Sequence, residues 1–315
     1  MTARAPDRLA TVDLGTNTVR LLVVESVGGA WRSIHQTQRV TRLGEGQAAT
    51  GRLLPEPMQR TAATVAEFAR AARGWGAGAV RIVATSAVRE AVNREEFVAT
   101  VEAESGEHVN VVSGEDEARL TLKGVASGLP GLGPSFLLFD IGGGSTEFVL
   151  ARDGTAEAAV SLRLGVVPLQ EEWGDRGPVR WDHFAQMREH IEDRLRRDVP
   201  ERIRGAGSGE LVGTAGTVTT LAALDLDLPA YDAARVQGHR LTRATVERLL
   251  ARLGALGVDE RARLPCLEPG RADVIIPGIA ICLATLACCR RDALVVSDRG
   301  LREGILCELL EGTER

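Results

Sequence analysis

Residues 136–150 read FLLFDIGGGSTEFVL, which is an apolar run, a glycine-rich turn that starts at an aspartate, and a second apolar run. Apolar and β-branched residues resume directly after the turn, so the pattern predicts a β-hairpin. A dinucleotide-binding motif would instead lead from its glycines into a helix. A P-loop is excluded as well, because the only lysine of the chain, Lys123, does not follow a glycine-rich turn.

A second copy of this pattern lies near the start of the chain. Residues 9–24 read LATVDLGTNTVRLLVV, again a strand, an Asp-x-Gly turn with hydroxyl side chains, and a strand. The rest of the chain alternates between strand-like and helix-like stretches, so we expect an α/β fold with two related lobes. The stretch 124–134 is rich in Gly and Pro and predicts the link between them.

Periodicity and turn residues predict the remaining elements. We expect further strands over 31–42, 80–84, 109–112, 158–164, 211–213 and 294–296. We expect helices over 57–73, 93–104, 115–125, 181–197, 217–224, 242–253, 271–289 and 301–310.

Composition excludes several classes of protein. A length of 315 residues predicts two domains, and a net charge of −5 does not suggest binding to nucleic acid. The chain has no run of 18 apolar residues, so no membrane span is predicted. Residues 1–8 lack the apolar core of a signal peptide. The five cysteines show no C-x-x-C spacing. These features predict a cytoplasmic location.

The two glycine-rich turns predict phosphate binding, because such turns point backbone N–H groups into one concavity and hydroxyls add donors. An aspartate at the strand end would repel phosphate unless a cation lies between them. Asp13 and Asp140 therefore predict a site for Mg²⁺ or another divalent cation. The expected phosphate contacts are Gly15, Thr16, Asn17, Thr18, Gly142, Gly143, Gly144, Ser145 and Thr146.

Three further segments carry candidate chemistry. The acids at 115–117 could supply a general base, or they could complete a capping box with Ser113 and favour the helix dipole. Small hydroxyl residues and Arg89 follow the strand at 80–84, which suits phosphate contact and equally suits a plain turn. The strand at 211–213 leads through small residues into a helix N-terminus, which suits an anion. Its candidate contacts are Gly213, Thr214, Gly216 and Thr217.

Six motifs in one order resemble the exopolyphosphatase/guanosine pentaphosphatase family of the actin–Hsp70–sugar kinase superfamily. They are residues 13–18, 84–89, 113–120, 140–147, 213–217 and 297–304, and the resemblance spans about residues 9–310. The resemblance implies two ribonuclease-H-like lobes of the actin-like ATPase type, with an interdomain active-site cleft. It implies a first domain of residues 1–126 and 300–315, and a second domain of residues 127–299.

The resemblance also implies roles for single residues. The water-activating glutamate of the family falls on Glu117, the acids of its second loop fall on Asp140 and Glu147, and its backbone phosphate contact falls on Gly142. Arginines that bind guanosine tetraphosphate in the family match Arg20 and Arg271. Without the resemblance, each of these two would be an ordinary surface arginine.

The function that we expect is an exopolyphosphatase that releases terminal phosphate from inorganic polyphosphate through a Glu-activated water and Mg²⁺. A guanosine pentaphosphate phosphohydrolase remains open, because both substrates are bound mainly through phosphates. A module that binds guanosine penta- or tetraphosphate with low turnover is a second alternative, and a sugar-kinase-like transferase is a third. An actin-like filament protein has no specific support. A homodimer is expected from the family alone.

Overall fold

The computed structural model describes residues 8–27, 30–206 and 209–313. The first seven residues, where we found no signal core, lie outside this part of the chain. By internal contacts, the chain divides into two compact units. Unit 1 comprises Met1–Ser113 and Gly304–Arg315, and unit 2 comprises Gly114–Glu303. Each unit is built on one β-sheet.

The sheet of unit 1 contains the first predicted hairpin. Its strands are β1 (Arg8–Leu14), β2 (Thr18–Val27), β3 (Ala30–Val40), β4 (Ala79–Ala84) and β5 (Val109–Val111). The strand order is β3-β2-β1-β4-β5. The hairpin strands and β3 pair antiparallel, whereas β1, β4 and β5 are parallel.

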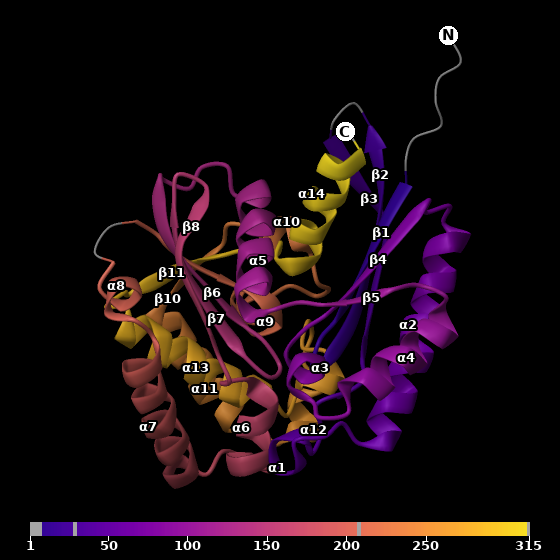
Figure 1. The fold of residues 1–315 in the computed structure, drawn as a ribbon. Coiled ribbons are helices and arrows are strands. Elements are labelled where there is room, and N and C mark those ends of the chain that lie inside the picture. Colours follow the sequence, from indigo (N-terminus) through magenta and orange to yellow (C-terminus); the bar gives the residue numbers. More distant parts are fainter. Residues whose placement is uncertain (1–7, 28–29, 207–208, 314–315) are drawn as a thin grey trace. The chain divides into compact units, whose positions relative to one another are not determined.

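Alternating apolar residues allow this sheet to bury both faces. Val12 and Leu14 of β1 belong to a core with α2 (Pro55–Gly74) and α4 (Arg94–Ser105), which lie on one face (Figure 1). Leu9 of β1 belongs to a separate cluster with Leu306 of α14 (Leu301–Thr313). Two short helices complete the unit, α1 (Gln47–Thr50) and α3 (Ser86–Glu90).

The sheet of unit 2 repeats this topology around the second predicted hairpin. Its strands are β6 (Ser135–Ile141), β7 (Thr146–Arg152), β8 (Thr155–Leu162), β9 (Leu211–Thr214), β10 (Arg240–Thr242) and β11 (Ala293–Val296). Read from β8, the order is β8-β7-β6-β9-β11, with β10 added at the edge. The antiparallel and parallel pairings match those of unit 1. The expected α/β fold with two related lobes is therefore confirmed.

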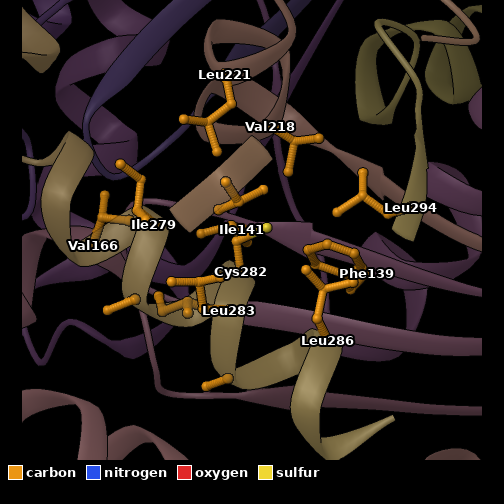
Figure 2. Packing of buried hydrophobic residues seen from close by; sticks show 14 of the residues in the cluster. Phe139, Ile141, Val166, Val218, Leu221, Ile279, Cys282, Leu283, Leu286 and Leu294 are labelled. Carbon is orange, nitrogen blue, oxygen red and sulfur yellow. The ribbon is translucent and has the colours of Figure 1, made fainter. Parts of the chain in front are cut away.

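The two faces of this sheet are covered differently. On one face, Phe136 and Leu138 pack with Ala118 and Leu122 of α5 (Gly114–Gly128). Phe139 and its neighbours point to the other face, where they meet helices α9 and α13 (Figure 2). The helices on that side are α6 (Val166–Trp173), α7 (Trp181–Asp198), α9 (Ala215–Asp225), α11 (Arg243–Gly254) and α13 (Ile275–Cys288). Shorter turns are α8 (Glu201–Arg204), α10 (Ala233–Val236), α12 (Val258–Arg261) and η1 (Pro269–Arg271).

Replacing Phe139 by alanine tests the packing of this core. Phe139 is fully buried and stacks on Phe148 with ring centroids 6.4 Å apart. We expect Phe139→Ala to lower the free energy of unfolding by about 3–5 kcal/mol, because the cavity adds to the lost transfer energy. Urea denaturation measures this change, and Phe148→Leu is a milder control on the same face. A loss below about 1 kcal/mol would contradict the packing.

The structure confirms the predicted strands and long helices, apart from the following differences. Residues 124–128 form the last turns of α5 instead of a link. A 3₁₀ turn over Pro269–Arg271 precedes α13, which begins only at Ile275. Strand β10 and helices α1, α3, α6, α8, α10 and α12 were not expected, because each is too short for a clear period. The predicted first domain ran to residue 126 and so included α5, whereas the contacts of α5 with β7 and β8 assign it to unit 2. The predicted domain bounds stay a prediction. No helix within the described ranges is long and apolar enough to cross a membrane.

Candidate functional site

The glycine-rich turn of unit 2 is closed by its own backbone. The amide of Gly142 donates to the carbonyl of Ser145 at 2.9 Å, so β6 leads directly into β7. A Cβ at Gly142 would lie 2.9 Å from that carbonyl oxygen, so the turn requires glycine there. Within the described residues, no acceptor is found for the amides of Gly143, Gly144 and Ser145. A turn with such amides can bind an anion.

Helix α6 holds the carbonyl side of this turn. The amides of Val166 and Val167 donate to the carbonyls of Gly142 and Gly143 at 3.2 and 2.9 Å. Gly165 makes the approach possible, because a Cβ there would lie 2.3 Å from the carbonyl oxygen of Gly143. The turn is thus fixed with its carbonyls occupied. Gly165 could not be found from the sequence, because no local pattern connects it with Gly142 and Gly143, which lie in an earlier hairpin.

Strand register places the predicted acids of unit 2 in one row. Glu147 on β7 lies opposite Asp140 on β6, and Ser161 on β8 lies opposite Glu147. Thr214 on β9 continues the row beside Asp140. The neighbours of these residues two positions away, such as Leu138 and Val149, pack toward α5, so the row lies on that face of the sheet. Glu147 is 2% exposed, and Asp140 is half-buried.

Helix α5 contributes the third predicted acid. Glu117 lies in its first turn beside Ala118, which packs against the sheet, and Glu117 is buried. Glu115 and Asp116, the other acids of this turn, are exposed. Burial thus separates Glu117 from its two neighbours, which the sequence pattern could not do. Three carboxylates, those of Glu117, Asp140 and Glu147, are carried on the α5 side of unit 2.

The chemistry of this donor set fits a hard divalent cation. Directly opposite side chains such as Asp140 and Glu147 have Cβ atoms about 5 Å apart, and like charges at that separation repel. A divalent cation relieves such repulsion, and Mg²⁺ typically uses only one or two carboxylates together with waters and substrate phosphates. Across the described part of the chain, no group of three or more His, Cys, Asp or Glu is arranged to hold a metal by itself.

The N-terminus of α9 forms a second anion-binding element of unit 2. Thr214 precedes the helix, and Ala215 adopts a left-handed φ of 71° at its first residue. The guanidinium of Arg271 lies over Gly216, where an added Cβ would be 1.4 Å from Nη1. Glu268 holds that guanidinium, with Oε2 3.1 Å from Nε of Arg271. A helix N-terminus and an arginine both favour an anion here.

Helix α13 packs tightly against the first turn of α9. A Cβ at Gly278 of α13 would lie 2.3 Å from Oγ1 of Thr217. Thr217 is buried. Gly213, at the end of β9, is a packing residue, because a Cβ there would lie 2.8 Å from the ring of Phe139.

Two predicted phosphate contacts have side chains that are used elsewhere. Thr146 is fully buried, and its hydroxyl donates to the carbonyl of Leu164 at 2.5 Å. The hydroxyl of Thr214 donates to the carbonyls of Ser297 and Arg299 at 3.0 and 3.1 Å. Both hydroxyls donate to the protein backbone, and the expected phosphate contacts of these two residues stay a prediction.

The loop after β11 fastens the C-terminal end of α5. Nη1 of Arg299 donates to the carbonyl of Ser127 at 2.9 Å, and Nε2 of Gln237 donates to that of Gly128 at 3.0 Å. The amide of Asp298 donates to Oε1 of Gln237 at 2.7 Å. These bonds satisfy carbonyls that every helix end leaves without partners. The loop after β11 and Gln237 thus hold the end of the helix that carries Glu117.

The turn of unit 1 has the same construction. The amide of Gly15 donates to the carbonyl of Thr18 at 3.1 Å, which closes the turn between β1 and β2. The amide of Gly44 donates to the carbonyl of Thr16 at 2.9 Å, and two further amides of that segment donate to Asn17 at 3.0 Å. Glycine at position 44 makes this close approach to Thr16 possible, because an added Cβ would lie 2.3 Å from Cγ2 of Thr16. In both units, therefore, backbone amides of a segment that follows the hairpin donate to the carbonyls of the glycine-containing turn.

The charges beside the two turns differ. Arg20 lies opposite Asp13 across the unit 1 hairpin, at the register position that Glu147 holds opposite Asp140 in unit 2. Nη1 of Arg20 is 3.7 Å from Oδ2 of Asp13, so this pair is compensated. Arg89 in α3 donates from Nη1 to the carbonyl of Val112 at 3.1 Å, which ties the ends of β4 and β5.

Comparisons with known proteins agree with this geometry. The family model described as the Ppx/GppA phosphatase family matches residues 22–313. Exopolyphosphatase 2 of Mycobacterium tuberculosis is 36% identical over 319 residues, which cover 96% of this chain and 98% of that protein. The crystal structure of the Aquifex aeolicus family member has a TM-score of 0.81 and 32% identity, over 98% of this chain and 99% of that one. An exopolyphosphatase from Cytophaga hutchinsonii has a TM-score of 0.89 and 27% identity, over 97% and 98% of the chains.

Proposed function

Because this chain belongs to the Ppx/GppA phosphatase family, we propose that it is an exopolyphosphatase, which hydrolyses the terminal phosphoanhydride bond of inorganic polyphosphate. The observation that carries the proposal is the set of Glu117, Asp140 and Glu147 on one face of the unit 2 sheet, beside a turn with available amides. Hydrolysis of a polyanion needs charge neutralisation and an aligned water. This set supplies groups for both.

Each residue has a proposed role. Glu117 accepts a proton from the attacking water, which a carboxylate does best where burial limits its hydration. The amides of Gly143, Gly144 and Ser145 bind oxygens of the terminal phosphate. Arg271 and the N-terminus of α9 bind phosphates further along the polyphosphate. The amides of the unit 1 turn and Arg20 are proposed to bind phosphate as well.

Mg²⁺ is the proposed cofactor, and Asp140 is its proposed protein ligand. Bound there, the ion would neutralise phosphate oxygens and favour attack by water. Asp13 was the other metal ligand expected from the sequence. Its ion pair with Arg20 makes it the less suitable of the two, because the arginine already compensates its charge.

Removal of the divalent cation is expected to abolish phosphate release. Excess EDTA should lower the rate of phosphate release from polyphosphate by at least about 100-fold, because the carboxylates and the substrate then repel each other. Adding back Mg²⁺ in excess of the chelator should restore the rate. Asp140→Asn should raise the Mg²⁺ concentration that gives half-maximal rate. Full activity in EDTA would remove the cation from the proposal.

Gly216→Ala tests the position of the Arg271 guanidinium. The new methyl group would occupy the place of Nη1, so the arginine must move away from the α9 N-terminus. We expect kcat/KM for polyphosphate to fall by about 10–100-fold, the cost of losing a charged hydrogen bond. Arg271→Ala should give a similar loss, and the double variant should be no worse. Gly131→Ala, where a Cβ meets nothing within 4 Å, is the matched control.

The substrate itself is tested by phosphate release with Mg²⁺. Polyphosphates of several lengths, guanosine pentaphosphate, guanosine tetraphosphate and ATP would be compared at equal phosphate concentration. Release from polyphosphate supports the proposal, whereas release from guanosine pentaphosphate alone would establish an alarmone phosphatase of the stringent response. Binding of these ligands without release would indicate a regulatory module.

The proposal includes assembly, which rests on the family resemblance, and location, which rests on the composition. We propose a cytoplasmic homodimer. Analytical ultracentrifugation at micromolar concentration would give the mass of the assembly, and fractionation of the producing cells would give the location.

A further inference from the structure

Strand β8 carries a serine in direct contact with one of the proposed active-site acids. Oγ of Ser161 donates to Oε1 of Glu147 at 2.6 Å. The two residues lie opposite each other in the β7–β8 ladder, so the backbone fixes their separation. The sequence gives no sign of this contact, because it depends on the register between two strands.

The two partners of this bond, a hydroxyl and a carboxylate, indicate its type. Oxygen–oxygen distances of about 2.5–2.7 Å are typical of a hydroxyl that donates to an ionised carboxylate, and such bonds are about twice as strong as neutral ones. Glu147 is 2% exposed, so water cannot readily replace the hydroxyl. A buried carboxylate that loses its donor is left incompletely paired.

The hydroxyl also limits how the carboxylate of Glu147 can turn. Glutamate has three rotatable side-chain bonds, and the bond to Ser161 constrains its carboxylate. Oε1 accepts from Ser161 on the β8 side, and Asp140 lies opposite Glu147 on β6. Glu117, from α5, lies on the same face of the sheet.

We propose that Ser161 is a positioning residue that orients Glu147 through the Oγ–Oε1 hydrogen bond and so aligns the acidic face for phosphoanhydride hydrolysis. This inference rests on the proposed function of the same site. Ser161 itself touches neither substrate nor water in the reaction. Its contribution passes entirely through Glu147.

Kinetics of position 161 variants with polyphosphate test the proposal. Ser161→Ala should lower kcat by about tenfold or more, the scale of a lost charged hydrogen bond, while KM changes by less than about threefold. Ser161→Thr keeps the hydroxyl and should restore most of kcat. Thr155→Ala removes an exposed hydroxyl from the same strand, where it donates to the nearby carbonyl of Arg152, and should leave kcat unchanged.

A double-mutant cycle separates positioning from general damage to the fold. In a Glu147→Gln background, Ser161→Ala should cause almost no further loss of kcat, because the residue through which it acts has already changed. Equal losses of kcat in the two backgrounds would overturn the proposal, as would unchanged kcat in Ser161→Ala. Absence of phosphate release by the wild-type protein would instead reject the proposed function, so the two failures are distinguishable.

Discussion

Replacing Glu117 by glutamine is expected to lower kcat for phosphate release from polyphosphate by about 10²–10⁴-fold, the usual contribution of a general base. Glutamine keeps the size of the side chain and its ability to hydrogen-bond, but it cannot accept the proton of the attacking water. The residue is buried in the first turn of α5, and the helix begins at Gly114, so its backbone position is well fixed. KM should change little, since the water and not the substrate loses its partner.

The same helical turn provides the controls for this experiment. Glu115 and Asp116 are exposed, so Glu115→Gln and Asp116→Asn change the charge of the turn without touching the buried position. Both should retain kcat within about threefold. A comparable loss in these controls would show that the helix N-terminal charge matters instead of a base, and near-normal turnover in Glu117→Gln would remove Glu117 from the mechanism.

The two hairpins could be predicted because their signal is local. Apolar runs on both sides of an Asp-x-Gly turn determine the strands, the turn and the alternation of faces within about fifteen residues of sequence. The second copy then predicted the two-lobe α/β class. The same alternation places Asp140 and Glu147 on the α5 face, since each strand side chain points opposite to its neighbours.

The remaining features could not be predicted because they depend on residues brought together only by the fold. Ser161 meets Glu147 through strand register, and Gly165 meets the turn through a helix that follows the next strand. Likewise, the ion pair of Asp13 with Arg20 requires the exact pairing of β1 with β2. Residues 124–128 were expected in a link because of their small and glycine residues, yet they are helical and their carbonyls accept bonds from Gln237 and from Arg299 in the loop after β11.

Gly165→Ala is the second substitution for which we expect a large effect. The backbone of Gly165 is extended, so glycine is not required there for its conformation. It is required for space, because a Cβ would lie 2.3 Å from both the carbonyl oxygen of Gly143 and the carbonyl carbon of Gly144. These are backbone atoms of the proposed phosphate-binding turn, so the turn itself must shift. A displacement of about 1 Å in a positioning group can cost about 100-fold in rate, and we expect that loss in kcat/KM.

The amides of Val166 and Val167 explain why the effect should reach the site. They hold the turn by its carbonyls, so pushing Gly165 away from Gly143 separates α6 from the turn or distorts both. The free energy of unfolding should fall by only about 1–3 kcal/mol, the usual cost of overpacking, which leaves a folded protein for kinetic measurement. Gly177→Ala, where a Cβ meets nothing within 4 Å, controls for the loss of glycine flexibility and should behave as wild type. A folded Gly165→Ala variant with unchanged kcat/KM would show that the turn over 142–145 does not bind the reacting phosphate, and the anion site would then have to be sought at the α9 N-terminus.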